Sequence, residues 1–253
     1  MKKIAICLYG QPREYKIGYK NIQHFITQQK NDVDIFFHCW YIEKGQIFNT
    51  SPWRFIDKQS LEYIDKELVH NDLLDLYKPK KYKFEKCIDI FDKSLYIDTI
   101  AYKNTTNNKM KNNINNTLSQ MYSRTEVKKL LEEYVIQTKT EYDYVVITRF
   151  DMKKNINLEL FNLDKNKVYV SKLHYPRKII PDNFIICSQS VFLMWFDIYN
   201  NLKNLLNNEK INENMKNYKE KLIVNAEELI TANFIYNFDI NNIVYLSNII
   251  NIL

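Results

Sequence analysis

Glycine is scarce in this sequence, with only 3 among 253 residues, and the nucleotide-binding motifs built on glycine are absent. A phosphate loop of the form Gly-x-x-x-x-Gly-Lys-Ser/Thr needs glycines at fixed spacing, and so does the Gly-x-Gly-x-x-Gly fingerprint of dinucleotide-binding folds. Neither pattern occurs in the chain. The sequence therefore argues against kinases and sulfotransferases that use a phosphate loop, and against a Rossmann enzyme with that fingerprint.

Long apolar runs and paired cysteines are also missing. No run approaches the length that spans a bilayer, and the apolar start Ile4 to Tyr9 is broken too early for a signal peptide by the turn that follows. The 4 cysteines stand far apart without a Cys-x-x-Cys pair, which favours buried free thiols in a reducing compartment. We expect a cytoplasmic protein, with peripheral association at the inner face of the membrane as an option.

The charge is modest and evenly spread. Lys and Arg number 36 against 30 Asp and Glu, giving a formal net charge of +6. This balance fits a polyanionic ligand or an anionic membrane surface, and the absence of a basic helix, a zinc spacing or an aromatic RNA-binding motif argues against nucleic acid. With 45% hydrophobic residues, the chain has an ordinary globular composition, and we expect one α/β domain over residues 1–253.

The most informative stretch runs from Tyr142 to Met152. The β-branched run Val145 to Ile147 is too short for a helix core and predicts a buried central strand. Arg149 and Asp151 follow at its carboxyl end, where ligands bind in open α/β sheets. The alternative is a surface ion pair, because an Arg-x-Asp triplet is expected by chance in a chain with this many charges.

The amino-terminal half has the order of a Rossmann-like fold. The strand Lys3 to Tyr9 is followed by Gly10 and a helix predicted from Glu14 to Gln29, and a second strand follows at Asp34 to Trp40. This order predicts a mostly parallel central sheet flanked by helices. Gly10 fits a backbone that approaches a ligand closely and equally an ordinary turn, whereas Arg13 is placed to meet phosphates near the helix amino terminus. His38 in the second strand is ranked lower, as a core histidine.

The remaining elements are predicted from periodicity and turn residues. Alternation predicts an outer strand with solvent-facing lysines, and a weakly patterned polar segment predicts a mobile loop or lid. An apolar helix is expected to be core, and a polar segment after it is expected to connect elements. The outer strand is Lys78 to Glu85, and the mobile loop or lid is Ile88 to Asn116. The apolar helix is Val191 to Leu206, and the polar connection is Asn207 to Lys221. Further helices are expected at Leu61 to Leu76, at Asn116 to Ile136 and from Asn225, strands at Lys167 to Ser171 and Phe184 to Ser188, and a strand or a packed tail from Asn241 to Leu253.

Several segments in order resemble a known family: glycosyltransferases of the GT-A fold from bacterial capsule, lipopolysaccharide and other surface-glycan gene clusters, with viral relatives. The resemblance rests on Ile6 to Arg13, Asp32 to Trp40, Ser119 to Ser123 and Tyr142 to Met152, and continues weakly through Asp182 to Phe184 and Ala226 to Leu229. It implies a GT-A-like domain whose residues 1–150 bind a nucleoside-diphosphate sugar and whose residues 151–253 face a saccharide or lipid-linked acceptor. The residues implied to surround the donor are Tyr9, Gly10, Gln11, Arg13, Ser119, Gln120, Tyr122 and Arg149.

The resemblance also implies roles for three acids. Asp151 corresponds to the acid of the Asp-x-Asp motif that binds Mn²⁺ or Mg²⁺, and Arg149 stands where the first acid of that motif is expected. Asp182 or Glu227 is the candidate general base if the reaction inverts configuration. Their ordinary readings are a residue at a strand entry for Asp182 and an acid in the first turn of a helix for Glu227. The competing functions are a non-catalytic nucleotide- or glycan-binding module and another nucleotide-using α/β transferase, such as a nucleotidyl- or sulfotransferase.

Overall fold

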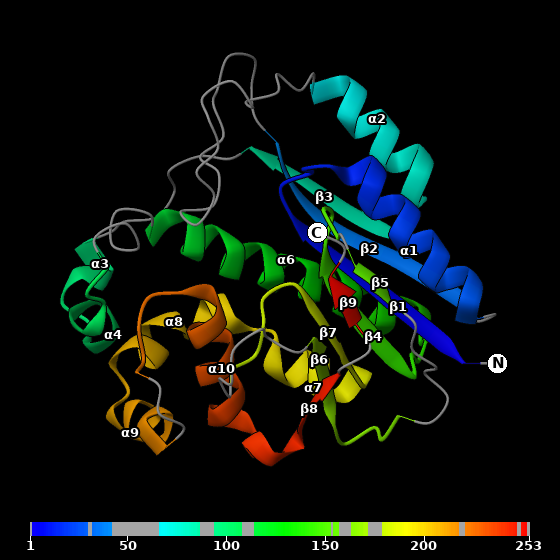
Figure 1. Ribbon diagram of the computed structural model, residues 1–253. Coiled ribbons are helices and arrows are strands. Elements are labelled where there is room, and N and C mark those ends of the chain that lie inside the picture. Colours follow the sequence, from blue (N-terminus) through cyan, green and yellow to red (C-terminus); the bar gives the residue numbers. More distant parts are fainter. Residues whose placement is uncertain are drawn as a thin grey trace.

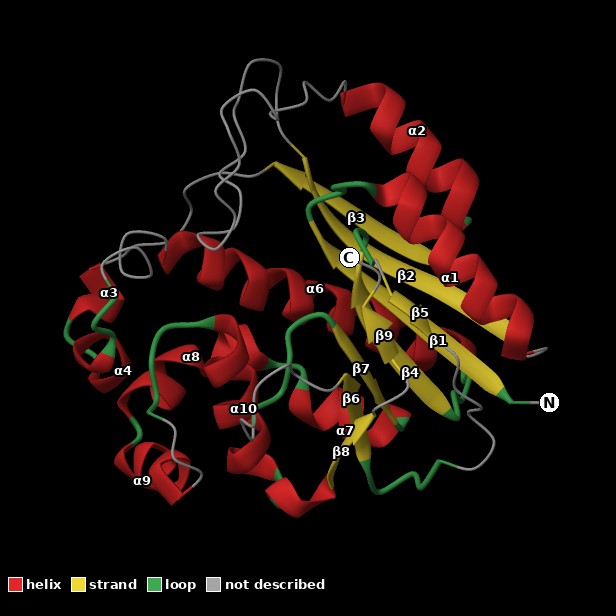
Figure 2. Cartoon of the chain, in the orientation of Figure 1, coloured by secondary structure: helices red, strands yellow, loops and turns green. Residues whose placement is uncertain are grey.

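A computed structural model provides the structure of the chain. It describes residues 2–29, 32–41, 66–86, 94–107, 114–152, 154–156, 163–171, 179–217, 221–246 and 249–251. Its centre is a seven-stranded sheet with the order β3-β2-β1-β4-β7-β6-β8, and helices cover both faces (Figure 2). Four of the six strand pairings are parallel; β7 runs antiparallel to both of its neighbours. The predicted mostly parallel α/β sheet is therefore confirmed.

The first half of the chain builds one side of the sheet and then reverses direction. The chain passes outward from β1 to β2 to β3 and then returns through the long helix α6 to β4, which pairs with the other edge of β1. This reversal makes the β1–β4 boundary a topological switch point, and in open α/β sheets ligands bind beyond the carboxyl ends of the strands at such a point. The elements are β1 (Lys3–Gly10), α1 (Tyr15–Gln29), β2 (Asp32–Tyr41), α2 (Lys66–Tyr77), β3 (Lys81–Lys86), α6 (Ile114–Thr138) and β4 (Tyr144–Arg149).

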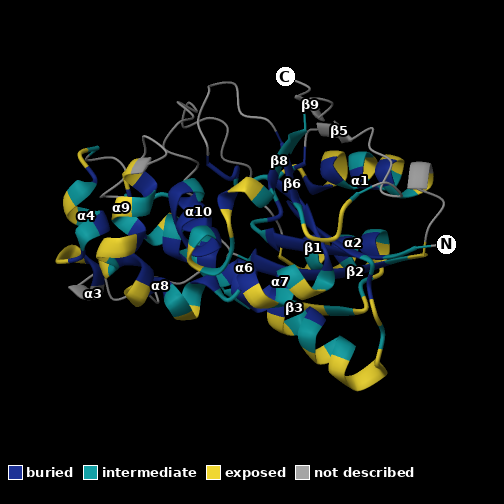
Figure 3. Cartoon of the chain, turned by 90° about the horizontal axis from the view of Figure 1, so that it is seen from below, coloured by how far each residue is buried: buried dark blue, intermediate teal, exposed yellow. Residues whose placement is uncertain are grey.

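The two faces of the sheet are separated by the two-residue period of its strands. In β1, Ile4, Ile6 and Leu8 pack with α1 and α2, while Ala5, Cys7 and Tyr9 pack in the cluster that includes α6. The same alternation continues in the neighbouring strands, so both faces of the central strands are apolar and buried. Helices α1 and α2 lie on one side of the sheet and α6 on the other (Figure 1), and the exposed residues gather on the outer faces of the helices (Figure 3).

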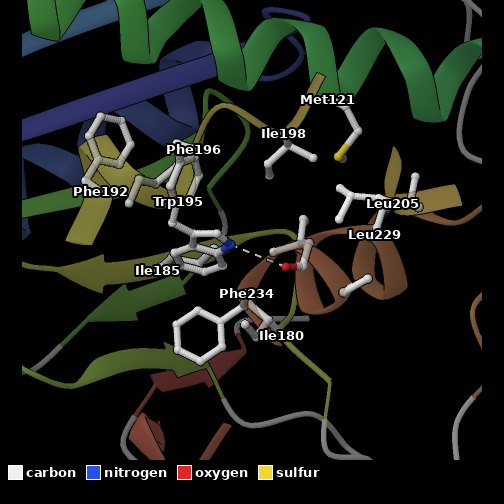
Figure 4. Close-up of a cluster of buried hydrophobic side chains, with 14 of the residues drawn as sticks. Met121, Ile180, Ile185, Phe192, Trp195, Phe196, Ile198, Leu205, Leu229 and Phe234 are labelled. Carbon is white, nitrogen blue, oxygen red and sulfur yellow. Dashed lines mark hydrogen bonds between the residues drawn. The ribbon is translucent and has the colours of Figure 1, made fainter. Parts of the chain in front are cut away.

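The second half of the chain extends the sheet and adds a helical layer beside α6. Trp195 in α7 packs against Phe234 in α10 at 4.9 Å between ring centroids and donates its indole N–H to the carbonyl of Ile230 at 3.4 Å (Figure 4). The elements are β6 (Val168–Ser171), β7 (Phe184–Cys187), α7 (Gln189–Trp195), α8 (Ile198–Asn207), α9 (Glu209–Asn217), α10 (Ala226–Asn237), η3 (Ile240–Asn242) and β8 (Ile243–Leu246), with a separate pair formed by β5 (Lys154–Ile156) and β9 (Ile249–Asn251).

Three expectations about the less regular segments were wrong. The segment Ile88 to Asn116 contains two short helices, α3 (Ser94–Ile97) and α4 (Ile100–Asn104), and the start of α6; its residues 88–93 and 108–113 lie outside the described part. The polar connection Asn207 to Lys221 contains α9, whose apolar Ile211 and Met215 lie one turn apart and are buried. The single helix predicted from Val191 to Leu206 is interrupted between α7 and α8.

The cysteine prediction holds where the structure describes it. Cys7, Cys39 and Cys187 are buried free thiols, and burial raises the pKa of each, while Cys87 lies outside the described residues. Among the described helices, none combines the length and the apolar character required to cross a bilayer.

Candidate functional site

A row of polar side chains crosses four parallel strands near their carboxyl ends. Tyr9 in β1 is in register with His38 in β2 and with Arg149 in β4, and His38 is in register with Lys83 in β3. We call Lys83, His38, Tyr9 and Arg149 the polar row. Because residues in register on parallel strands point to the same face, the polar row lies on the face of the sheet that α6 covers.

Helix α6 supplies partners for three members of this row. Glu126 accepts a hydrogen bond from Lys83 at 2.8 Å, Ser123 is 2.7 Å from His38, and Arg124 donates to the hydroxyl of Tyr9. These α6 side chains are buried although they are polar. Burying a polar group costs free energy unless it is paired, and each of these three side chains is paired with a member of the polar row.

A chain of hydrogen bonds leads from β3 to the turn after β1. Glu85 is 3.0 Å from Nε2 of His38, whose Nδ1 is 2.7 Å from Oγ of Ser123, and that Oγ accepts the backbone N–H of Gly10 at 2.9 Å. Burial lowers the pKa of His38. For Glu85, the hydrogen bond from His38, together with the hydrogen bond and charge of Lys83, outweighs the effect of burial and lowers the pKa to about 2. A neutral His38 that donates from Nε2 to Glu85 and accepts from Ser123 fits these contacts. The chain fixes the position of Gly10, whose φ is +98°.

At the other end of the row, Arg149 is held between two carboxylates. Its Nε and Nη2 donate to the two oxygens of Asp151 at 2.8 and 2.6 Å, and its Nη1 lies 3.6 Å from Oδ2 of Asp182. Burial opposes the charge of Arg149, but the Asp151 and Asp182 carboxylates outweigh it and raise the pKa of Arg149. The side chain is still 34% exposed, so the guanidinium is fixed in orientation and accessible to a ligand.

A second arginine, Arg124, contacts Tyr9 and the backbone of Asp182. Arg124 is completely buried, with its guanidinium carbon 4.2 Å from the centre of the Tyr9 ring. Its Nη2 donates to the hydroxyl of Tyr9 and to the backbone carbonyl of Asp182, and the Tyr9 hydroxyl donates to the same carbonyl. Burial raises the pKa of Tyr9 to about 12, so the phenol stays neutral at physiological pH. These contacts join β1, α6 and Asp182, two residues before the start of β7.

Hydrogen bonds hold the segments that follow β4 and precede β7 in place. Asn183 accepts hydrogen bonds at its backbone carbonyl from Thr148 and at its side-chain oxygen from Ser171, both at 2.8 Å. In addition, Asn21 in α1 donates to the carbonyl of Met152 at 2.6 Å. Gly18, one turn earlier in α1, lets the helix touch the backbone of Phe150 and Met152. The turn that carries Asp151 is therefore fixed between the sheet and α1.

The structure brings most of the sequence-predicted residues to this region, in different ways. Gln120 donates to Oδ2 of Asp182 at 2.8 Å, Tyr122 donates to Glu85 at 3.1 Å, and the carbonyl of Ser119 accepts from Trp40. These three residues lie in the second and third turns of α6, which begins at Ile114 rather than at the predicted Asn116.

The remaining predicted residues lie beside the site rather than in the polar row. Gln11 and Arg13 follow β1, where Nε of Arg13 donates to Gln11 at 2.7 Å. Glu227 is in the first turn of α10, and its backbone carbonyl accepts from Thr231. The hydroxyl of Thr231 also accepts the backbone N–H of Ile180, which connects α10 to the segment before Asp182.

Sequence reasoning missed four residues of the site: Ser123, Arg124, Glu85 and Lys83. Ser123 and Arg124 lie in the middle of a helix whose pattern predicted only core and surface positions, and Lys83 was expected to face solvent. No spacing signal marked Ser123 and Arg124, because the buried polar residues of α6 are mostly consecutive in the sequence rather than spaced along one helix face. His38, ranked low as a core residue, is indeed buried, but it is part of the hydrogen-bond chain to Gly10.

Comparisons with known proteins add little to this geometry. No family model matches the sequence, and no curated protein matches it. Among solved structures, the chain is similar to the apo structure of the bifunctional glycosyltransferase WbbM, with a TM-score of 0.38 and 11% sequence identity over 97% of this chain. The chain spans 38% of the length of that protein. A TM-score at this level does not establish a common fold or function.

Proposed function

We propose that the protein is a glycosyltransferase that binds a nucleoside-diphosphate sugar at the switch point between β1 and β4 and transfers the sugar to a saccharide or lipid-linked acceptor. The observation that carries the proposal is Arg149, an accessible guanidinium held between Asp151 and Asp182 at the carboxyl end of β4. The order of sequence segments that resemble the GT-A glycosyltransferases supports the same assignment. A role in surface-polysaccharide synthesis at the cytoplasmic face of a membrane remains part of the proposal.

Transfer of a glycosyl group breaks the bond between the sugar and the diphosphate, and negative charge accumulates on the departing phosphate. A guanidinium already oriented by Asp151 can meet that charge with two parallel N–H bonds, without reorganising during the reaction. Charge-assisted hydrogen bonds of this kind contribute about 1.5–3 kcal/mol each. The role of Asp151 in this arrangement is to orient Arg149.

The acceptor hydroxyl must lose a proton when it attacks the sugar. Asp182 is the candidate base for an inverting reaction, because its carboxylate is 23% exposed and is held in place by Gln120. Glu227 in the first turn of α10 is the second candidate. A retaining reaction needs neither as a dedicated base.

The Mn²⁺ or Mg²⁺ expected at Asp151 stays a prediction. The residues present fit a divalent cation poorly, because Arg149 donates to both carboxylate oxygens of Asp151. A dication on the same carboxylate would face the guanidinium at close range, with a repulsion of several kcal/mol at an effective dielectric near 20. We therefore derive no step through a metal ion.

Release of nucleoside diphosphate from a panel of sugar nucleotides, without acceptor, tests the proposal. We expect the parent protein to hydrolyse at least one donor slowly, and Asp151→Ala to reduce the rate about 100-fold because Arg149 loses the partner that orients it. Asp75→Ala, an exposed acid in α2, is the matched control and should leave the rate unchanged.

A thermal-shift measurement with the same panel separates the competing functions. Stabilisation by a sugar nucleotide without any release of diphosphate would favour a non-catalytic binding module, since a ligand that binds only the native state raises its stability by mass action. If no donor stabilised the protein and none released diphosphate, the proposal would be refuted.

A further inference from the structure

The guanidinium of Arg149 has hydrogen-bonding capacity left after its contacts with the protein. A guanidinium has more N–H donors than one carboxylate can accept, and Asp151 accepts only one from Nε and one from Nη2. Nη1 lies 3.6 Å from Asp182, beyond a normal hydrogen bond. With the side chain one third exposed, these remaining donors can bind two oxygens of a phosphate group.

Arg124 adds a positive charge that the described protein does not neutralise directly. Among the described residues, it makes no ion pair, and its Nε and Nη1 are buried without a hydrogen-bond partner. Buried polar groups without partners are rare in folded proteins and call for an explanation such as a bound ion or ligand. The donor Nη2 places this charge against the hydroxyl of Tyr9 and the backbone carbonyl of Asp182, whose carboxylate lies 3.6 Å from Nη1 of Arg149.

The charges of the Arg-x-Asp triplet balance without a metal ion. Two carboxylates with one dication sum to zero, and so do Arg149 and Asp151 as they stand. Adding a dication to the present pair would leave an excess of positive charge and would compete with the guanidinium for both oxygens of Asp151. Arg149 therefore occupies, in its contacts, the place that a metal ion would take on Asp151, and it brings one positive charge where the ion would bring two.

We infer that this protein binds the diphosphate of its nucleotide ligand through Arg149, supported by the buried charge of Arg124, and without a divalent cation. The inference rests on the proposed function, because it concerns how the same donor site holds its ligand. It adds Arg124 as a positioning residue that acts through Tyr9 and the backbone of Asp182.

Isothermal titration calorimetry with UDP, GDP, ADP and CDP tests the inference on the parent protein, in EDTA and in Mn²⁺. We expect at least one of these nucleotides to bind. Its affinities in the two buffers should agree within about threefold, which is a difference of less than 1 kcal/mol in the binding free energy. An increase of about tenfold or more in Mn²⁺ would overturn the inference while leaving the proposed function intact. If none of the four nucleotides bound in either buffer, the proposed function itself would be refuted.

Two substitutions at Arg149 sharpen the result. Arg149→Lys keeps the charge but loses the planar fork, so binding in EDTA should weaken by about 10- to 150-fold, the range for one lost charge-assisted hydrogen bond. Arg149→Asp restores two acids around Phe150, and it should bind the nucleotide only in Mn²⁺. Electron paramagnetic resonance should then detect protein-bound Mn²⁺ in Arg149→Asp and not in the parent. Undiminished binding by Arg149→Asp in EDTA would overturn the inference.

The control for the charge change is Lys203→Asp, an exposed position in α8 that alters the net charge by the same amount. Its nucleotide affinity should match that of the parent in both buffers. Circular dichroism of each variant establishes that it is folded before binding is compared.

Discussion

The contact between α1 and the turn after β4 makes Gly18→Ala the most specific test of how the site is held. A methyl group at Gly18 would overlap the carbonyl oxygen of Phe150 and lie 2.8 Å from its carbonyl carbon and 3.2 Å from the backbone nitrogen of Met152. Backbone atoms cannot rotate away as a side chain can, so α1 or the turn must move. The hydrogen bond from Asn21 to the Met152 carbonyl spans the same contact and would lengthen.

The size of the effect follows from opposing contributions. Inserting a methyl group into a packed contact costs about 1–3 kcal/mol, and weakening a hydrogen bond adds about 1 kcal/mol. Replacing glycine inside a helix by alanine stabilises the helix by about 1 kcal/mol. We expect a net loss of about 2 kcal/mol in the free energy of unfolding, together with weaker nucleotide binding, because Asp151 lies between Phe150 and Met152.

Urea denaturation followed by circular dichroism measures the first effect, and calorimetric titration with a nucleoside diphosphate measures the second. Lys20→Ala, at an exposed position of the same helix, is the control and should change the free energy of unfolding by less than about 0.5 kcal/mol. A Gly18→Ala protein as stable as the parent, or more stable, would show that α1 does not touch this turn and would refute the reasoning.

Three further predictions concern the hydrogen-bond chain that ends at Gly10. Gly10→Ala meets no atom within 4 Å but must adopt a φ of +98°, so urea denaturation should show a loss of about 1–2 kcal/mol from backbone strain alone. Ser123→Ala leaves the N–H of Gly10 without its acceptor and should destabilise the protein by about 1–3 kcal/mol while weakening nucleotide binding, as calorimetry would detect. Burial lowers the pKa of His38 in the folded state, so the unfolded chain binds the proton more readily. Stability should therefore fall as the pH drops below about 6.5, the ordinary histidine value, and His38→Gln should lose this part of the pH dependence; an unchanged profile in the variant would contradict a buried neutral His38.

The parallel core could be predicted because its pattern is local. Strands β1, β2 and β4 are short runs rich in β-branched or aromatic residues, β3 alternates charged and aromatic residues, and the helices between them show helical spacing. The polar segment that contains α9 failed this test, since only Ile211 and Met215 carry its apolar face. A pair of apolar residues is too little periodicity to predict a helix from sequence.

The stretch from Tyr142 to Met152 shows where sequence alone stops. By itself, the sequence determined a buried strand that ends in Arg149 and Asp151, because hydrophobic periodicity and the change to charged residues are properties of consecutive positions. Only the tertiary structure decided what these charges face. The return of the chain through α6 places β4 beside β1, which puts Tyr9 in register with Arg149 and brings Arg124 and Asp182 to the same point. Those contacts join residues far apart in the sequence, and no local pattern encodes which of them meet.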